Sequence, residues 1–157
     1  MILATVGMQL PFPRFIHALN EIAGRHRLNI VAQAMEPVAG LRFLDQRESL
    51  SPKDFDALAC RAEVIVGHAG IGTILSAARA EKPIILYPRV AALGEHRNEH
   101  QLATAREFAA RIGIYVAHTN QELESLLLRN DLQAFKPANS VQTHELVQRV
   151  RAFVDSR

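Results

Sequence analysis

The sequence of 157 residues has few of the features that mark secreted, membrane-spanning or metal-caged proteins. Cys60 is its only cysteine, which excludes a disulfide framework and a cysteine zinc cage and fits a reducing compartment. No uninterrupted apolar run reaches about 18 residues, so we expect no membrane span. The N-terminal MILATVGMQL has no basic stretch ahead of its apolar residues, which argues against a secretory signal. We therefore expect a cytoplasmic protein.

The sequence also has only a small excess of positive over negative charge and few aromatic residues. Lysine and arginine total 18 against 16 acidic residues, aromatic residues make up 6%, and tryptophan is absent. Nucleic-acid binding needs a concentrated basic surface and usually stacking aromatics, so we expect no nucleic-acid partner. A small anionic ligand is still compatible with this composition, because a few cations and a helix N-terminus suffice to bind one pyrophosphate.

The hydrophobic pattern predicts an α/β fold. The length and the 48% hydrophobic content suit one globular domain over residues 1–157. Continuous apolar runs, typical of strands buried on both faces, predict strands at 2–6, 28–32, 63–66, 83–87 and 114–116, with a short one at 41–44. Such strands, with helices between them, predict a parallel sheet in a Rossmann-like three-layer domain.

Helical periodicity and capping signals separate these strands. Ser51 followed by Pro52 marks one helix start, and Thr119 with Glu122 forms a capping box at another. The remaining helices are expected over 15–23, 72–80, 99–111 and about 141–155. The last of these has an apolar face that would pack on its own sheet or on a partner.

Three loops of unusual content follow predicted strands, at residues 7–12, 67–73 and 89–101. The carboxyl ends of parallel strands meet at one edge of a sheet, where ligands bind in such folds. We therefore expect these loops to form a ligand site. In the first loop Gln9 can hydrogen-bond a ligand, although the prolines at 11 and 13 also suit a plain chain reversal.

The segment GHAGIGT at residues 67–73 lies between a predicted strand and a predicted helix. Its three glycines allow a ligand to approach the backbone, and the N–H groups and dipole of the helix start favour a phosphate oxygen. It lacks the lysine of a P-loop and the spacing of the dinucleotide fingerprint. A tight turn capped by Thr73 is the alternative interpretation.

The segment GEHRNEHQ at residues 94–101 offers imidazoles, a guanidinium, amides and carboxylates just before a predicted helix. Such mixed donors and acceptors suit sugar hydroxyls, whereas a solvated charged loop is the alternative. His96, Glu99 and His100 also spell H-x-x-E-H, an inverted zinc-protease pattern. That motif needs both histidines on one helix, and His96 is expected at or before the helix start, so a zinc hydrolase ranks last.

Together these segments resemble a known family. The stretches ILATVGMQLPFPRFIHAL, AEVIVGHAGIGTILSAARAEKPIILYPR and EHRNEHQLATA are similar, in that order, to the C-terminal, donor-binding half of GT-B glycosyltransferases of family 28. The likeness covers about residues 1–118 and is strongest to the split, two-subunit members. These include the catalytic subunit of the dolichol-linked N-acetylglucosaminyltransferase and bacterial exopolysaccharide counterparts. The resemblance implies a single GT-B half.

The resemblance also implies roles for individual residues. The diphosphate of a UDP-sugar would be bound by Gly7, Gln9, His68, Ala69, Gly70, Gly72 and Thr73. The sugar would contact Asn98, His100 and Gln101, and the nucleoside would contact Phe43, Leu44 and Ser76. Positive charge near the departing UDP would come from Arg89 or Arg97.

The implied reaction is inverting, metal-independent transfer of a hexosyl or N-acetylhexosaminyl unit from a UDP-sugar to a lipid-linked or polysaccharide acceptor, without a cofactor. The catalytic base is expected on a separate, membrane-associated acceptor-binding subunit, which would hold this chain at the inner face of the membrane. Two positions depart from the family pattern. Ser76 stands where many relatives carry a glutamate for the ribose, and Met8 replaces a small hydroxyl residue. These departures favour the alternative of a UDP-sugar-binding module without turnover.

Overall fold

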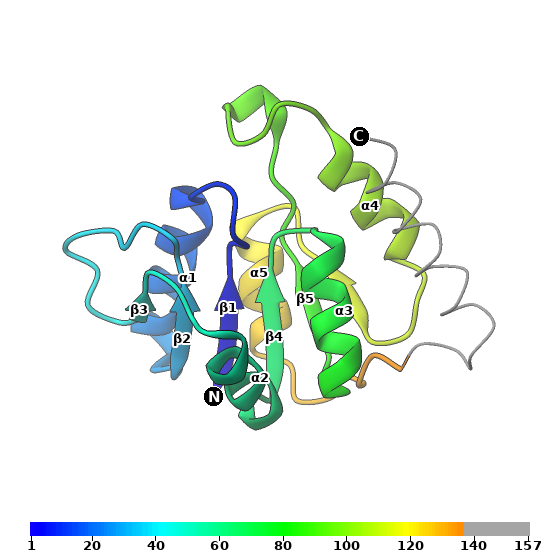
Figure 1. The fold of residues 1–157 in the computed structure, drawn as a ribbon, viewed down its shortest axis with the longest axis horizontal. Helices are drawn as coiled ribbons and strands as arrows, with labels where there is room; N and C mark the ends of the chain where they lie inside the picture. The colour runs from blue at the N-terminus through cyan, green and yellow to red at the C-terminus, as the bar shows by residue number, and fades with distance from the viewer. Residues whose placement is uncertain (137–157) are drawn as a thin grey trace.

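A computed structural model describes residues 1–136, and the helix predicted over 141–155 lies outside the described residues. The described chain contains a six-stranded sheet with the order β3-β2-β1-β4-β5-β6, and every neighbouring pair is parallel (Figure 1). The strands are β1 (Ile2–Thr5), β2 (Ile30–Gln33), β3 (Asp45–Arg47), β4 (Val64–Gly67), β5 (Ile84–Leu86) and β6 (Ile114–Val116). The predicted Rossmann-like parallel sheet is confirmed.

Helices cover both faces of this sheet (Figure 1). They are α1 (Pro13–His26), α2 (Pro52–Arg61), α3 (Ile71–Ala80), α4 (His100–Phe108) and α5 (Asn120–Leu127), with a 3₁₀ turn at Ala91–Leu93. Side chains alternate between the faces of a strand, so Ala4 packs with α1 and α5 while Leu3 packs with α2, α3 and α4. The two hydrophobic clusters give the expected three layers.

The chain order places a crevice at the centre of the sheet. After β1 the chain adds β2 and β3 on one side, then returns to place β4 on the other side of β1. Thr5, the last residue of β1, pairs with Gln33 of β2 and Gly67 of β4, so the three strand ends lie level. Ligands of open α/β sheets bind at such a switch point, beyond the carboxyl ends of the strands.

The short strand expected at 41–44 is wrong, because the edge strand β3 begins only at Asp45. Phe43 instead lies against α1, where a Cβ on Gly24 would come 2.7 Å from its ring. Its backbone N–H donates to Asn20 Oδ1 at 3.0 Å. These contacts hold the segment on α1, and the polar residues after it pair with β2.

Candidate functional site

A cleft of about 630 Å³ opens at the carboxyl ends of β1 and β4. Its lining comes from all three loops singled out in the sequence, including Gly7, Gln9, His68, Gly70, Gly72, Thr73, Arg89 and Gln101. Thr5 and Gln33 add polar atoms from the strand ends. The volume falls in the range of about 300–1,000 Å³ that is usual for small-molecule sites.

The N-terminus of α3 opens into this cleft. Its N-cap is Gly70, which has no side chain to cap the helix, so the alternative of a turn capped by Thr73 is wrong. Thr73 donates its backbone N–H to Gly70 O at 3.1 Å, whereas the N–H groups of Ile71 and Gly72 have no acceptor within residues 1–136. A Cβ on Gly72 would meet nothing within 4 Å. Free N–H groups and the helix dipole make this end suited to an anion.

The glycines at positions 7 and 70 make room for a side chain of the protein itself. A Cβ on Gly7 would come 2.6 Å from His68 Cε1, and one on Gly70 would overlap His68 Nε2. Gly7 also has a φ of +81°, which disfavours any side chain. The imidazole of His68 therefore fills the space between the first loop and the start of α3. Of these three glycines, Gly72 is the one that faces open space.

Burial determines the charge of His68. Loss of solvent, with a smaller contribution from the positive charge of Arg89, lowers the pKa of His68 to about 4. Its Nδ1 lies 3.5 Å from Thr73 Oγ1. At neutral pH the ring is uncharged, so it can hydrogen-bond a ligand without adding a full positive charge.

The cleft also has an apolar wall that the sequence reasoning missed, made by Leu50, Pro52 and Phe55. Ser51 caps α2 by accepting the N–H of Asp54 at 3.1 Å, which fixes the start of that helix beside the cleft. Ser51 and Pro52 predicted where this helix begins, but not which of its residues line the cleft.

Ser76 and Arg79 of α3 also line the cleft. Ser76 Oγ donates to Gly72 O at 2.9 Å, and Arg79 Nη2 donates to Ser76 Oγ at 3.4 Å. The Ser76 hydroxyl is therefore engaged within its own helix, whereas Arg79 brings a cation to the cleft. Sequence reasoning had not singled out Arg79.

Some predicted site residues lie away from the cleft lining. Phe43 is 57% exposed beside α1, and Ala69 is buried in the core. Asn98 and His100 are exposed at the start of α4, and Arg97 lines a neighbouring groove. These residues and Leu44 are absent from the lining of the cleft, and their binding roles stay predictions.

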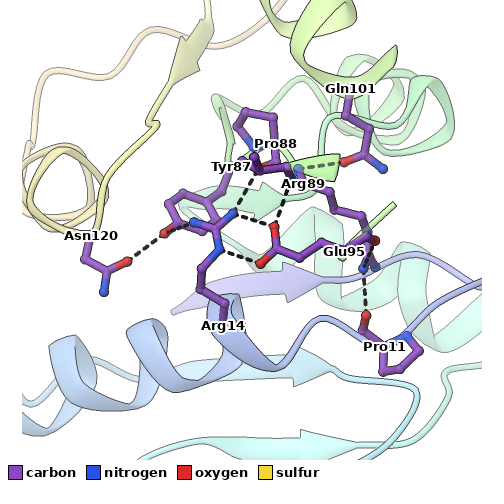
Figure 2. A network of polar contacts seen from close by, with 9 residues as sticks. Pro11, Arg14, Tyr87, Pro88, Arg89, Glu95, Gln101 and Asn120 are labelled. Carbon is purple, nitrogen blue, oxygen red and sulfur yellow. Dashed lines mark hydrogen bonds and ion pairs between the residues drawn. The ribbon is translucent and has the colours of Figure 1, made fainter. Parts of the chain in front are cut away.

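Arg89, predicted as a cation near the leaving group, is engaged with the backbone. It is 2% exposed, and its guanidinium donates to the carbonyl oxygens of Pro11 at 2.6 Å, Leu10 at 2.5 Å and Val6 at 3.0 Å. Its backbone N–H donates to Gln101 Oε1 at 3.1 Å. Arg89 thus joins two of the loops that line the cleft (Figure 2).

A second arginine, also missed from the sequence, makes the reverse connection. Arg14, at the start of α1, forms two hydrogen bonds to the Glu95 carboxylate, at 2.5 and 2.8 Å, and lies 4.5 Å above the Tyr87 ring. Tyr87 in turn donates to Asn120 Oδ1 at 2.6 Å. The hydrogen bond to Glu95 raises the pKa of Arg14, which stays charged. Figure 2 shows Arg14 between Glu95 and Tyr87, with Asn120 beside Tyr87.

The histidines of the H-x-x-E-H pattern do not share a helix. His96 lies in the loop before α4, Glu99 is the N-cap of α4, and His100 is its first residue. Across residues 1–136 no group of three His, Cys, Asp or Glu side chains could hold a metal ion. None of the helices described is both long and apolar enough to cross a membrane.

The fold resembles solved glycosyltransferase structures. The solution structure of ALG13 matches with a TM-score of 0.63 and 15% identity, covering 93% of each chain. The glycotransferase of kitacinnamycin matches at 0.60 and 18%, covering 83% of this chain and 34% of that one. SsfS6 from Streptomyces sp. SF2575, solved with thymidine diphosphate, matches at 0.56 and 18%, covering 83% of this chain and 32% of that one. The chain therefore spans about a third of the length of the latter two.

The fold and the anion-suited cleft define a Rossmann-like domain, a fold shared with these solved structures. The family model described as the glycosyltransferase family 28 C-terminal domain matches residues 26–152, most of the sequence. The chain belongs to this family, and the resemblance stated from the motifs is confirmed. No curated protein sequence gave a significant match.

Proposed function

We propose that the chain is the donor-binding half of an inverting, metal-independent glycosyltransferase that moves a hexosyl or N-acetylhexosaminyl unit from a UDP-sugar to a lipid-linked or polysaccharide acceptor. The observation that carries this proposal is the open N-terminus of α3, whose first N–H groups, at Ile71 and Gly72, point to a cleft rather than to a capping side chain. A diphosphate suits that position because it carries negative charge where the helix dipole is positive.

The charges around the cleft fit this chemistry. In the transfer, an acceptor oxygen replaces the UDP oxygen at the anomeric carbon, and the charge that develops collects on the departing UDP. None of the described residues lining the cleft is an aspartate or glutamate, whereas Arg79 and Arg89 are cations. Fixed donors aimed at a developing negative charge lower the barrier to such a step. The proposed reaction uses no cofactor.

The shape of the cleft suggests where the nucleoside lies. Leu50, Pro52 and Phe55 form an apolar wall of the cleft, and a flat base can stack on such a surface. Arg79 and Ser76 also line the cleft, and we place the ribose beside them. We assign this wall to the nucleoside in place of Phe43 and Leu44.

The acceptor side and the catalytic base belong, in this proposal, to a separate subunit. The described domain corresponds to about a third of the longer structural neighbours. A groove of about 580 Å³ shares Leu10 and His96 with the cleft and carries the exposed Leu93. We assign this groove to the acceptor side. The subunit would deprotonate the acceptor and hold this cytoplasmic chain at the inner face of the membrane.

Titration calorimetry with UDP, with and without EDTA, tests the donor site. We expect binding in the micromolar to sub-millimolar range that does not change when metal is removed. The decisive variant is Gly72→Asp, because a carboxylate at the start of a helix stabilises the helix but would repel the diphosphate. Gln121→Asp is the matched control, since Gln121 is the second residue of α5 as Gly72 is of α3, and it is exposed outside the cleft.

We expect Gly72→Asp to abolish UDP binding with no loss of thermal stability, and Gln121→Asp to bind UDP normally. Wild-type affinity in Gly72→Asp, or no UDP binding by the wild type at millimolar concentration, would overturn the proposal.

One observation favours a second candidate, a UDP-sugar-binding module without turnover. Position 76 carries a serine rather than a glutamate, so it offers no carboxylate to the ribose, and its hydroxyl is already bonded to the backbone of its own helix. Radiolabelled sugar transfer separates the two functions. Transfer that requires both this chain and an acceptor-binding protein supports the enzyme, whereas UDP binding without transfer in any such mixture supports the module.

A further inference from the structure

Arg89 is the largest fully buried side chain among the described residues. Its guanidinium contacts carbonyl oxygens rather than a carboxylate, and it lies 4.4 Å above the Phe12 ring. Burying a cation without a bonded anion is costly, and an apolar residue would fill the same volume at lower cost. The contacts made by this side chain therefore point to a role beyond filling the core.

These contacts fix the first loop. The carbonyl groups of Val6, Leu10 and Pro11 all turn toward the Arg89 guanidinium, which draws together the two ends of the loop. Between these anchors, the N–H groups of Met8 and Gln9 have no acceptor in the described part of the chain. They remain available on a loop that lines the cleft.

The backbone of Arg89 fixes a second group, the side chain of Gln101. Only an oxygen can accept the Arg89 N–H, so the contact at 3.1 Å sets which way the Gln101 amide faces. Its NH₂ group is then left as a donor on a residue that is 8% exposed and lines the cleft. Figure 2 shows the amide oxygen toward Arg89 and the nitrogen on the other side.

Arg14 connects the same two segments as Arg89, but from the other segment. Arg89 reaches from the segment after β5 to the first loop, and Arg14, just after that loop, reaches back to Glu95. Glu95 also accepts the Val90 N–H at 2.9 Å, next to Arg89. The two arginines therefore cross-link the same pair of segments twice.

We propose that Arg89 is a positioning residue for donor binding, which holds the first loop and Gln101 in one fixed arrangement through directional hydrogen bonds rather than through its charge. The proposal rests on the donor site proposed above. It differs from the expectation that Arg89 neutralises the leaving group, and the two roles predict opposite results for a charge-conserving substitution.

Arg89→Lys distinguishes these roles, because lysine keeps the charge but cannot donate in four fixed directions to the carbonyl groups of Val6, Leu10, Pro11 and Glu95. We expect Arg89→Lys and Arg89→Met to lose at least tenfold in UDP affinity by calorimetry. Arg111→Met is the matched control: it also removes an arginine lying over a phenylalanine ring, at 5.3 Å from Phe108, but away from the cleft. It should bind UDP like the wild type. Wild-type affinity in Arg89→Lys would overturn the positioning role.

A second measurement does not depend on any ligand. In NMR spectra of the free protein, Arg89→Lys should shift the Gln101 side-chain NH₂ signals and the backbone amide signals of Met8 and Gln9, while Arg111→Met should leave both unchanged. If Arg89 variants do not fold, Glu95→Gln, which weakens the reverse link, should produce the same changes in smaller size.

These readouts separate the two proposals. Unchanged spectra in folded Arg89→Lys would overturn the positioning role even if the wild type binds UDP. A wild type that does not bind UDP, with spectra that change as expected, would leave the positioning role standing and remove the proposed function.

Discussion

Two parts of the cleft lining are held in different ways. The turn His68–Thr73 is shaped by glycines packed against a neutral imidazole, whereas the segment Arg89–Gln101 is held by guanidinium groups. We call these the glycine wall and the arginine wall. The glycine wall depends on close contact and leaves backbone N–H groups free, whereas the arginine wall depends on hydrogen bonds that occupy carbonyl groups. A site for an anion needs both: free donors at the ligand, and acceptors turned away from it.

An added methyl group should disrupt the glycine wall most. Gly7→Ala forces a side chain onto a φ of +81° and to 2.6 Å from the His68 ring, and we expect it to lose about 3 kcal/mol of unfolding free energy. Urea unfolding measures this. Gly72→Ala, where a Cβ meets nothing, should change stability by less than about 1 kcal/mol. Equal stability of Gly7→Ala and the wild type would show that the imidazole does not hold this wall.

Acid should weaken the glycine wall through His68. The pKa of His68 is about 4 in the folded protein and about 6.5 in an unfolded chain, so the unfolded state binds the extra proton between these values. The stability of the fold is then complete above about pH 6.5 and falls as the pH approaches 4. From pH 7 to pH 5 the wild type should lose about 2 kcal/mol more than His68→Gln. Parallel unfolding curves for both proteins at the two pH values would contradict this.

Breaking the ion pair between Arg14 and Glu95 should affect the arginine wall. The two side chains are 27% and 11% exposed, so their attraction is less screened than that of a surface pair. We expect a coupling energy of about 1–2 kcal/mol in a double-mutant cycle with Arg14→Met and Glu95→Gln. A cycle on the exposed pair Arg47 and Asp45 should give a smaller value. Equal couplings would mean that this pair adds nothing special to the wall.

The smallest expected effect concerns the nucleobase of UDP and extends the comparison to the apolar wall of the cleft. Phe55→Ala should weaken UDP binding about tenfold, because stacking on an aromatic ring contributes about 1–3 kcal/mol per base. Phe43→Ala should leave UDP affinity unchanged, since Phe43 lies against α1 outside the cleft. Calorimetry on both variants decides between the two positions, and the reverse result would restore the assignment made from the sequence.

Local signals predicted most of the fold. Buried parallel strands have continuous apolar runs, and the capping box of Thr119 and Glu122 forms as expected. The failure at 41–44 has a physical cause. Within residues 1–136, β3 is an edge strand that pairs only with β2, through backbone hydrogen bonds. Its residues Asp45, Gln46 and Arg47 show no hydrophobic pattern. Hydrophobic side chains nearby, such as Phe43, pack on a helix instead.

The site could be predicted from the sequence only where its residues lie together in one short segment. The glycine-rich turn and the helix start after it are contiguous in sequence, so their chemistry could be derived from residue types. It could not be predicted that the His68 ring fills the space at Gly7 and Gly70, because the placement of this ring depends on two segments about 60 residues apart. The pairing of Arg14 with Glu95 spans 81 residues and has no local signal.

The crossed arginine contacts limit how new donor preferences can arise in this scaffold. If residues 6–14 alone were replaced by those of a relative, Arg14 would be lost and the Glu95 carboxylate left without its guanidinium, while the Arg89 guanidinium would face carbonyl groups on a loop of different shape. Chimeras that exchange both segments together should fold, while single grafts should yield insoluble chains. The two segments should therefore change together, because a substitution in one is tolerated only if the contacts with the other are kept.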